Sequence, residues 1–128
     1  AIAKGNSEIS ETIYENRMGH VDLLNSMGAS IKLVNNIAKI QGVDELNGQN
    51  LKGSDLRSTA ALIIAALSAK DTSYIGGLEH LDRGYECFES KLNILGANIT
   101  RNFNEQIFFN QNIVDKNICK NTEKYKAA

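Results

Sequence analysis

An internal repeat constrains the fold of this chain more than any single motif does. Residues 7–32 and residues 72–100 each contain a strand-like segment, an Asn-Arg or Asp-Arg dipeptide, a helical segment and a Gly-Ala ending. The two endings are Met27-Gly28-Ala29-Ser30-Ile31 and Leu95-Gly96-Ala97-Asn98-Ile99. Such self-similarity indicates one supersecondary unit used twice. Because strands and helices alternate along the chain, we expect an α/β fold of repeated strand-helix-hairpin units.

Hydrophobic periodicity and turn residues divide the rest of the chain into further elements. Asn35-Asn36 joins two short strand-like runs and is typical of a tight hairpin, because asparagine tolerates positive φ. Ala1 to Lys4, followed by Gly5, are typical of the last turn of a helix. The predicted strands are residues 7–14, 29–34, 37–41, 49–53, 72–78 and 103–109, the predicted helices are 16–27, 56–69 and 82–95, and residues 115–128 are predicted as a frayed tail.

Two of the predicted helices differ in character. The helix at 56–69 is capped by Ser54 or Asp55, and it is apolar on nearly every side, so we expect it to be buried all round under a sheet. The helix at 82–95 is amphipathic, and Gly96 ends it. Its apolar face is predicted to contain Tyr85, Phe88, Leu92 and Leu95.

Composition excludes several classes of function. The formal net charge of -1 gives no field for nucleic acid or for an anionic membrane. Cys87 and Cys119 form no C-x-x-C pair and have no histidine at metal-ligand spacing, so neither a metal site nor a disulfide is expected. The longest apolar run, Ala60 to Leu67, is too short to span a bilayer. We therefore expect a soluble, cytoplasmic protein with no cofactor, no metal, no nucleic-acid partner and no membrane contact.

Three of the four arginines, Arg17, Arg57 and Arg83, lie where a predicted strand gives way to a predicted helix. A cation in the first turn of a helix opposes the helix dipole and forgoes about 0.3–1 kcal/mol. The guanidinium fork suits a bidentate grip on carboxylate or phosphate. These positions indicate a site for a small, highly charged anion. The alternative is three separate surface ion pairs of little energetic consequence, each with a nearby acid: Glu15, Asp55 or Asp82.

The residues around the three arginines carry a family resemblance. The segments Ile9-Ser10-Glu11-Thr12-Ile13-Tyr14-Glu15-Asn16-Arg17-Met18, Asp55-Leu56-Arg57-Ser58-Thr59-Ala60-Ala61-Leu62 and His80-Leu81-Asp82-Arg83-Gly84-Tyr85-Glu86 resemble the C-terminal part of the UDP-N-acetylglucosamine 1-carboxyvinyltransferase family, which are enolpyruvyl transferases. The resemblance covers residues 1–101 as part of one domain and leaves residues 102–128 as an unmatched extension. It implies a domain built as an inside-out α/β barrel of three repeated units, with buried helices and outer sheets.

The resemblance also implies a reaction and its partners. The reaction is transfer of the enolpyruvyl group of phosphoenolpyruvate to the 3′-hydroxyl of UDP-N-acetylglucosamine, with release of phosphate, in peptidoglycan synthesis. The partners are these two substrates and the N-terminal part of the same enzyme. By the same resemblance Arg83 lies against the phosphate, Arg17 and Arg57 lie on the carboxylate side of the phosphoenolpyruvate pocket, Glu15 and Asp55 orient those arginines or line the closed site, and the backbone of Ile13 touches the UDP-sugar.

Departures from the family pattern limit these expectations. The family's cysteine acid, its phosphate-binding lysine and the aspartate near the sugar hydroxyl belong to sequence upstream of Ala1, so no catalytic residue is assigned in this chain and the isolated chain is expected to be inactive. Cys87 is predicted to lie mid-helix and is not a candidate acid. His20 and His80 receive no role. Two other classes of function remain open: a non-catalytic module that binds an anion or a UDP-sugar, and a structural α/β repeat.

Overall fold

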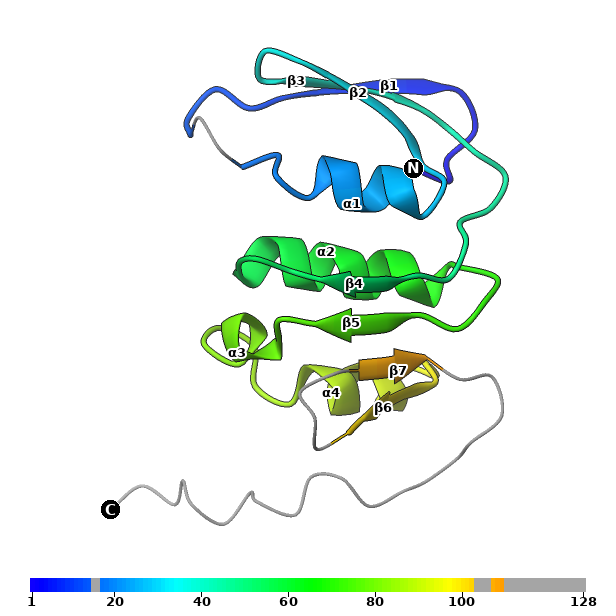
Figure 1. The fold of residues 1–128 in the computed structure, drawn as a ribbon, viewed down its shortest axis with the longest axis vertical. Coiled ribbons are helices and arrows are strands. Elements are labelled where there is room, and N and C mark those ends of the chain that lie inside the picture. Colours follow the sequence, from blue (N-terminus) through cyan, green and yellow to red (C-terminus); the bar gives the residue numbers. More distant parts are fainter. Residues whose placement is uncertain (15–16, 103–106, 110–128) are drawn as a thin grey trace.

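The computed structural model describes residues 1–14, 17–102 and 107–109, and it arranges them as two sheets with helices packed beside them (Figure 1). The first unit contains β1 (Asn6–Ser10), α1 (Val21–Ser26), β2 (Ser30–Val34) and β3 (Ile37–Gln41). Its sheet has the order β1-β3-β2, and both neighbouring pairs are antiparallel.

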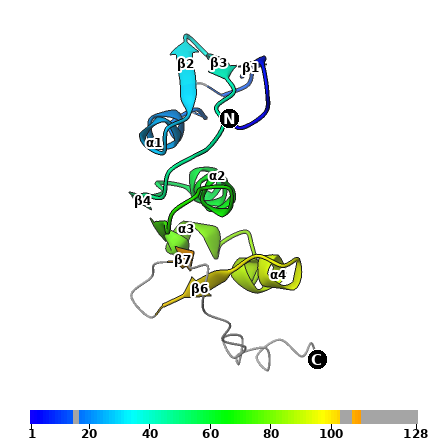
Figure 2. The same ribbon diagram turned by 90° about the vertical axis from the view of Figure 1, so that its right-hand side faces the viewer.

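The second sheet has the order β4-β5-β7-β6. Strand β4 pairs with β5 in parallel, and the other neighbouring pairs are antiparallel. In Figure 2, α2 and α4 lie on the same side of this sheet, and α1 lies between the first sheet and α2. The elements of this part are β4 (Asn50–Lys52), α2 (Leu56–Leu67), β5 (Tyr74–Gly76), α3 (Leu78–Leu81), α4 (Phe88–Ile94), β6 (Ile99–Arg101) and β7 (Ile107–Phe109).

The structure confirms the internal repeat. The path β1-α1-β2-β3 and the path from β5 through α3 and α4 to β6 and β7 both place their last strand between the other two. An asparagine braces the end of the helix in each copy. Asn25 donates to the carbonyl of Ile31 at 2.8 Å and accepts from its N–H at 3.0 Å, and Asn93 makes the same two bonds with Ile99 at the same two distances. The α/β fold class is therefore confirmed.

The core joins the two sheets through the helices. Met27, Leu62, Ile63, Ile75 and Leu78 are fully buried in one cluster. Helix α2 supplies two of them, as its apolar sequence predicts. The prediction that α2 is buried all round was wrong on one side, because Ile64 is 59% exposed and no described element covers that side.

The helix predicted at 82–95 is present only as α4, because the short helix α3 ends at Leu81 and residues 82–87 form a break between the two helices. Tertiary contacts cause the break. A Cβ on Gly84 would stand 2.9 Å from Cδ2 of Leu56, so this segment lies against the start of α2. Cys87 has φ 44° and takes the N-cap position of α4, so its predicted place within a helix was also wrong. Leu95, which was predicted on the apolar face, is 82% exposed.

Several predicted boundaries also shift. The first repeated helix starts at Val21, several residues after its predicted start, because residues 17–20 form turns. Residues 1–4 form no helix; instead Ala1 accepts from the N–H of Val43 at 2.9 Å, and Gly5 accepts from the N–H of Gly42 at 2.8 Å. The tight hairpin at Asn35-Asn36 is confirmed, with φ 53° at Asn35. The predicted tail at 115–128 and residues 103–106 of a predicted strand lie outside the described residues.

Candidate anion-binding site

The three segments that carry the arginines lie along one edge of the molecule: the turn from β1 to α1, the turn from β4 to α2, and the stretch from the end of β5 through α3 to Arg83, called here the α1, α2 and α3 junctions. Strands β1, β4 and β5 all run toward the left-hand side of Figure 1, where the chain turns before α1, α2 and α3. Only Arg57 is in the first turn of a helix; Arg17 precedes the His20 cap of α1, and Arg83 follows α3. The predicted first-turn position was therefore wrong for two of the arginines, while their place at one edge follows from the shared direction of the three strands.

The α2 junction is held by a capping box. One carboxylate oxygen of Asp55 accepts from the backbone N–H of Arg57 at 2.8 Å and from that of Ser58 at 3.0 Å. The hydroxyl of Ser58 accepts in return from the N–H of Asp55 at 3.0 Å. Because a carboxylate binds these N–H groups better than a carboxylic acid does, the bond from Ser58 lowers the pKa of Asp55. Asp55 therefore fixes the backbone of Arg57 and leaves its guanidinium group without an ion pair among the described residues.

Close backbone contacts join the α2 junction to the α3 junction. The N–H of Gly53, which follows β4, donates to the carbonyl of Gly76 at 3.1 Å. The hydroxyl of Thr59 donates to the carbonyl of Gly77 at 3.3 Å. A Cβ on Gly77 would stand 2.3 Å from the carbonyl oxygen of Gly53. Since the residue before Arg57 also touches the residue after Arg83, these two arginines belong to one local structure.

Asp82 does not pair with its neighbour Arg83. Its two carboxylate oxygens accept from the two terminal nitrogens of Arg101, at 2.9 and 2.5 Å. Arg83 is exposed and has no ion pair with any residue that the structure describes. The alternative of three separate surface ion pairs is thus wrong for Arg57 and Arg83, because their local carboxylates are engaged elsewhere.

The α1 junction has a different arrangement. The carboxylate of Glu11 accepts from the backbone N–H of Ile13 at 2.8 Å and from that of Tyr14 at 3.2 Å, which ends β1 four residues before the predicted boundary. These bonds, led by that from Ile13, lower the pKa of Glu11. Arg17 reaches the same carboxylate at 3.4 Å and lies over the ring of Tyr14, 4.0 Å from its centre. Because Glu11 engages the backbone N–H of Ile13, the carbonyl is the backbone group of that residue that remains for a ligand.

The structure brings together some of the predicted site residues and not others. Arg57, Asp55 and Arg83 belong to adjoining junctions, whereas Ile13 and Arg17 belong to the segment between β1 and α1 in the first unit. Glu15 lies outside the described residues. Sequence reasoning missed Glu11 and Arg101. Local side-chain-to-backbone bonds of this kind are typical of Ser, Thr, Asn and Asp, so no sequence signal pointed to Glu11. The pairing of Arg101 with a residue nineteen positions away has no sequence signature either.

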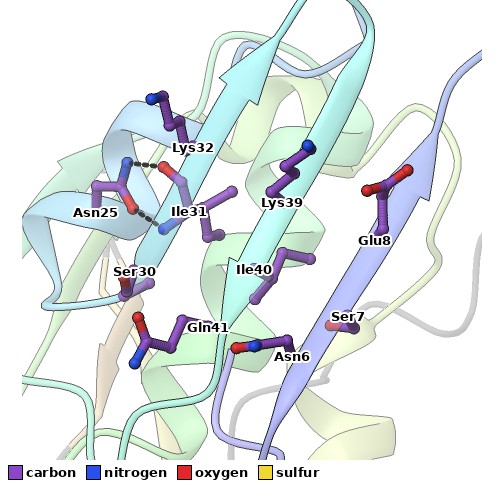
Figure 3. A pocket seen from close by; sticks show the side chains of 11 residues that line it. Asn6, Ser7, Glu8, Asn25, Ser30, Ile31, Lys32, Lys39, Ile40 and Gln41 are labelled. Carbon is purple, nitrogen blue, oxygen red and sulfur yellow. Dashed lines mark hydrogen bonds between the residues drawn. The ribbon is translucent and has the colours of Figure 1, made fainter.

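A separate hollow of about 740 Å³ lies on the first unit (Figure 3). Strands β1, β2 and β3 and the end of α1 line it, and Glu8, Lys32 and Lys39 contribute side chains from neighbouring strands. None of the predicted site residues in the described part of the chain lines it. It lies toward the Asn6 end of β1, whereas the arginine junction follows the other end, so we do not assign the anion site to this hollow.

Comparison with known proteins decides the family. The family profile described as EPSP synthase (3-phosphoshikimate 1-carboxyvinyltransferase) matches residues 1–92 of this chain. The chain belongs to the enolpyruvyl transferase family. Curated relatives indicate which member of this family the chain resembles. It is 59% identical over 128 residues, all of this chain and 28% of the relative, to the UDP-N-acetylglucosamine 1-carboxyvinyltransferase of Prochlorococcus marinus (strain MIT 9301).

A second relative and two solved structures agree with this family. The chain is 52% identical over 101 residues to the UDP-N-acetylglucosamine 1-carboxyvinyltransferase of Synechocystis sp. (strain ATCC 27184 / PCC 6803 / Kazusa), covering 79% of this chain and 23% of the relative. The enolpyruvyl transferase NikO from Streptomyces tendae superposes with a TM-score of 0.66 and 29% identity, over 73% of this chain and 22% of that one. EPSP synthase from Acinetobacter baumannii gives 0.66 at 15% identity, over 84% and 26%, and shows the fold alone.

The chain spans about a quarter of the length of these enolpyruvyl transferases. The alignment with the first relative runs through all 128 residues, whereas the family profile ends at residue 92. No helix in the described part of the chain is both long and apolar enough to cross a membrane.

Proposed function

We propose that this chain forms part of an enzyme that transfers the enolpyruvyl group of phosphoenolpyruvate to the 3′-hydroxyl of UDP-N-acetylglucosamine and releases phosphate. The reaction supplies a precursor for peptidoglycan. Support comes from relatives of this name at 52–59% identity and from the exposed guanidinium groups at one edge of the fold. The rest of the enzyme, a cytoplasmic location, a domain of residues 1–101 with an extension at 102–128, and an inside-out α/β barrel as its setting are parts of the same proposal.

The arginines carry the proposed chemistry of this chain. Phosphoenolpyruvate has a carboxylate and a phosphate, and charge builds up on the phosphate as the bond to the enolpyruvyl group breaks. Arg83 is assigned to the phosphate, and Arg57 and Arg17 to the carboxylate side. Asp55 fixes the backbone from which Arg57 extends, Glu15 lines the site, and Ile13 offers its carbonyl to the UDP-sugar. No catalytic acid, cofactor or metal is assigned to these residues.

The observation that carries the proposal is the state of Arg57 and Arg83. Both are exposed, and neither has an ion pair among the described residues, although an acid lies within two positions of each in the sequence. An exposed ion pair contributes only about 0–1 kcal/mol, so neither arginine needs a partner for the stability of the fold. Two unpaired forks on adjoining junctions leave a local positive field that a small dianion fits.

A chimaera tests this function. Residues 1–128 replace the matching segment of the Prochlorococcus marinus (strain MIT 9301) relative, whose alignment covers all of them. We expect phosphate release that requires both phosphoenolpyruvate and UDP-N-acetylglucosamine. The kcat/KM should be within about tenfold of that of the intact relative, which corresponds to a loss of no more than about 1.4 kcal/mol in transition-state stabilisation. The matched control carries alanine at Arg17, Arg57 and Arg83 and should be folded and inactive.

A chimaera that folds, by thermal unfolding, but releases no phosphate above background contradicts the proposal. That result favours a non-catalytic binding module or a structural repeat. Isothermal titration with phosphoenolpyruvate then separates these two, because a binding module retains heat of binding and a structural repeat does not.

A further inference from the structure

The fourth arginine of the chain, Arg101, lies at the end of β6, away from the three junctions in sequence. Its guanidinium group nevertheless reaches the α3 junction. It binds both carboxylate oxygens of Asp82 and lies 3.7 Å from Glu89. The bond to Asp82 raises the pKa of Arg101, so this side chain is a permanent cation.

Three features distinguish this pair from an isolated surface contact. The bonds to Asp82 are bidentate, which fixes the plane of the guanidinium group against that of the carboxylate. Glu89 is 6% exposed, and its second carboxylate oxygen has no hydrogen-bond partner among the described residues, so Arg101 is the cation that compensates it. The Arg101 side chain is itself only 27% exposed.

Asp82 is the sequence neighbour of Arg83, and its carboxylate is the nearest negative charge in sequence to that guanidinium group. A free carboxylate at this place competes with an anionic ligand for Arg83 and cancels its field. Arg101 neutralises the carboxylate and turns it toward β6. The unpaired state of Arg83 is therefore a consequence of the Asp82–Arg101 pair.

We propose that Arg101 is a positioning residue of the anion site, which sequesters Asp82 and so keeps Arg83 available for the phosphate of the substrate. This inference rests on the function proposed above. It concerns affinity for the anionic substrate rather than the chemical step, because Arg101 acts through the carboxylate of Asp82. A purely structural ion pair differs from it in one respect: removal of Asp82 should then do as much harm as removal of Arg101.

The test is a mutant cycle in the chimaera with the Prochlorococcus marinus (strain MIT 9301) relative. Arg101→Gln frees the Asp82 carboxylate and should raise KM for phosphoenolpyruvate by about tenfold, with kcat and the KM for UDP-N-acetylglucosamine changed by less than about twofold. Asp82→Asn alone should leave all these constants within about twofold. The double variant Arg101→Gln with Asp82→Asn should restore the KM for phosphoenolpyruvate, because the competing charge is gone.

The single and double variants are matched, since both leave Glu89 without its cation and differ only in the charge of residue 82. Lys70→Gln removes an exposed ion pair with Glu45 and is the control for a change of net charge. If Arg101→Gln does not fold, Arg101→Lys, which keeps the charge but loses the fork, should raise KM by no more than about threefold. Whether or not Arg101→Gln folds, Asp82→Asn can still refute the inference through its KM for phosphoenolpyruvate.

A double variant no better than Arg101→Gln overturns the inference, and so does a tenfold rise of KM in Asp82→Asn. Arg83→Ala in the same chimaera separates this inference from the proposed function. If Arg83→Ala weakens use of phosphoenolpyruvate while Arg101→Gln does not, the inference fails and the proposed function stands. If Arg83→Ala has no effect in an active chimaera, the assignment of Arg83 to the phosphate fails and the inference fails with it, while a chimaera that releases no phosphate contradicts the proposed function.

Discussion

At the residue scale, the carboxylates beside the arginines bind backbone N–H groups or a distant cation. Glu11 holds the turn after β1, and Asp55 holds the first turn of α2. The sequence showed that acids accompany the arginines, because both are local in the chain. It could not show which donor each acid takes, since that choice depends on whether a backbone N–H group or a guanidinium group is nearer in the folded chain.

Removal of the Asp55 carboxylate should destabilise the fold. Asp55→Ala leaves two N–H groups of α2 unbonded and should lower the free energy of unfolding by about 1 kcal/mol. The pKa of Asp55 is lowered from its ordinary value of 3.8 in the folded state, so this contribution is complete above that pH and is lost as the pH falls through the lower, folded value. Urea unfolding of both proteins at neutral pH and at pH below 4 should show the difference shrinking in acid; a difference that stays constant contradicts this role.

Substitution of Arg57 tests whether the site needs the bidentate guanidinium group or only its positive charge. Arg57→Lys in the chimaera keeps the cation and loses the bidentate geometry, so kcat/KM for phosphoenolpyruvate should fall by at least about tenfold, with Arg57→Ala lower still. Steady-state kinetics with varied phosphoenolpyruvate provide the measurement. Equal activity of the lysine variant and the parent chimaera would show that a point charge is sufficient.

At the element scale, the parts that depend on neighbouring residues were predictable and the parts that depend on distant contacts were not. The hairpin at Asn35-Asn36, the start of α2 and the glycine stops all follow from local chemistry. The break between α3 and α4 does not, because it depends on Leu56 packing on Gly84 and on β6 supplying Arg101. This break exposes Arg83 in a turn, so the missed element is also the one that shapes the candidate site.

The contact between the α2 and α3 junctions can be tested at Gly77. Gly77→Ala forces a side chain into a residue with φ 88° and places its Cβ 2.3 Å from the carbonyl oxygen of Gly53. Gly5→Ala is the matched control, because Gly5 has φ 94° but no atom within 4 Å of the added Cβ. Urea unfolding should show a loss of about 1 kcal/mol for the control and at least about 3 kcal/mol for Gly77→Ala. Equal losses would mean that the two junctions are not held together by this contact.

At the scale of the whole molecule, the repeat was the part of the fold that sequence predicted best. Two copies of one unit must bury similar faces, so similar sequence endings appear in both. In the structure Asn25 and Asn93 make equivalent hydrogen bonds at the ends of the two helices. The placement of the three junctions on one edge depends on the directions of the strands, which only the folded structure shows. The substrates came from the family resemblance and remain a proposal, as do the assignments of the individual site residues.

The 128-residue chain by itself should bind anions weakly and catalyse nothing. Enolpyruvyl transfer requires an acid for the methylene carbon and a base near the sugar hydroxyl, and the resemblance assigns neither to these residues. Phosphate release by the purified chain with both substrates should equal that of buffer alone. Turnover near the ordinary enzyme range, on the order of 1–1000 per second, would contradict this expectation.

The most direct test of the anion site is the effect of Arg83→Ala in the chimaera on the two substrates separately. Removing a charge-assisted hydrogen bond from a desolvated site costs about 2–4 kcal/mol of transition-state stabilisation, so kcat/KM for phosphoenolpyruvate should fall by about 30-fold to 1000-fold. The KM for UDP-N-acetylglucosamine should stay within about threefold, because that substrate lies elsewhere in the site. An unchanged kcat/KM for phosphoenolpyruvate would show that Arg83 is only a surface cation at a turn, and the anion site would have to be abandoned.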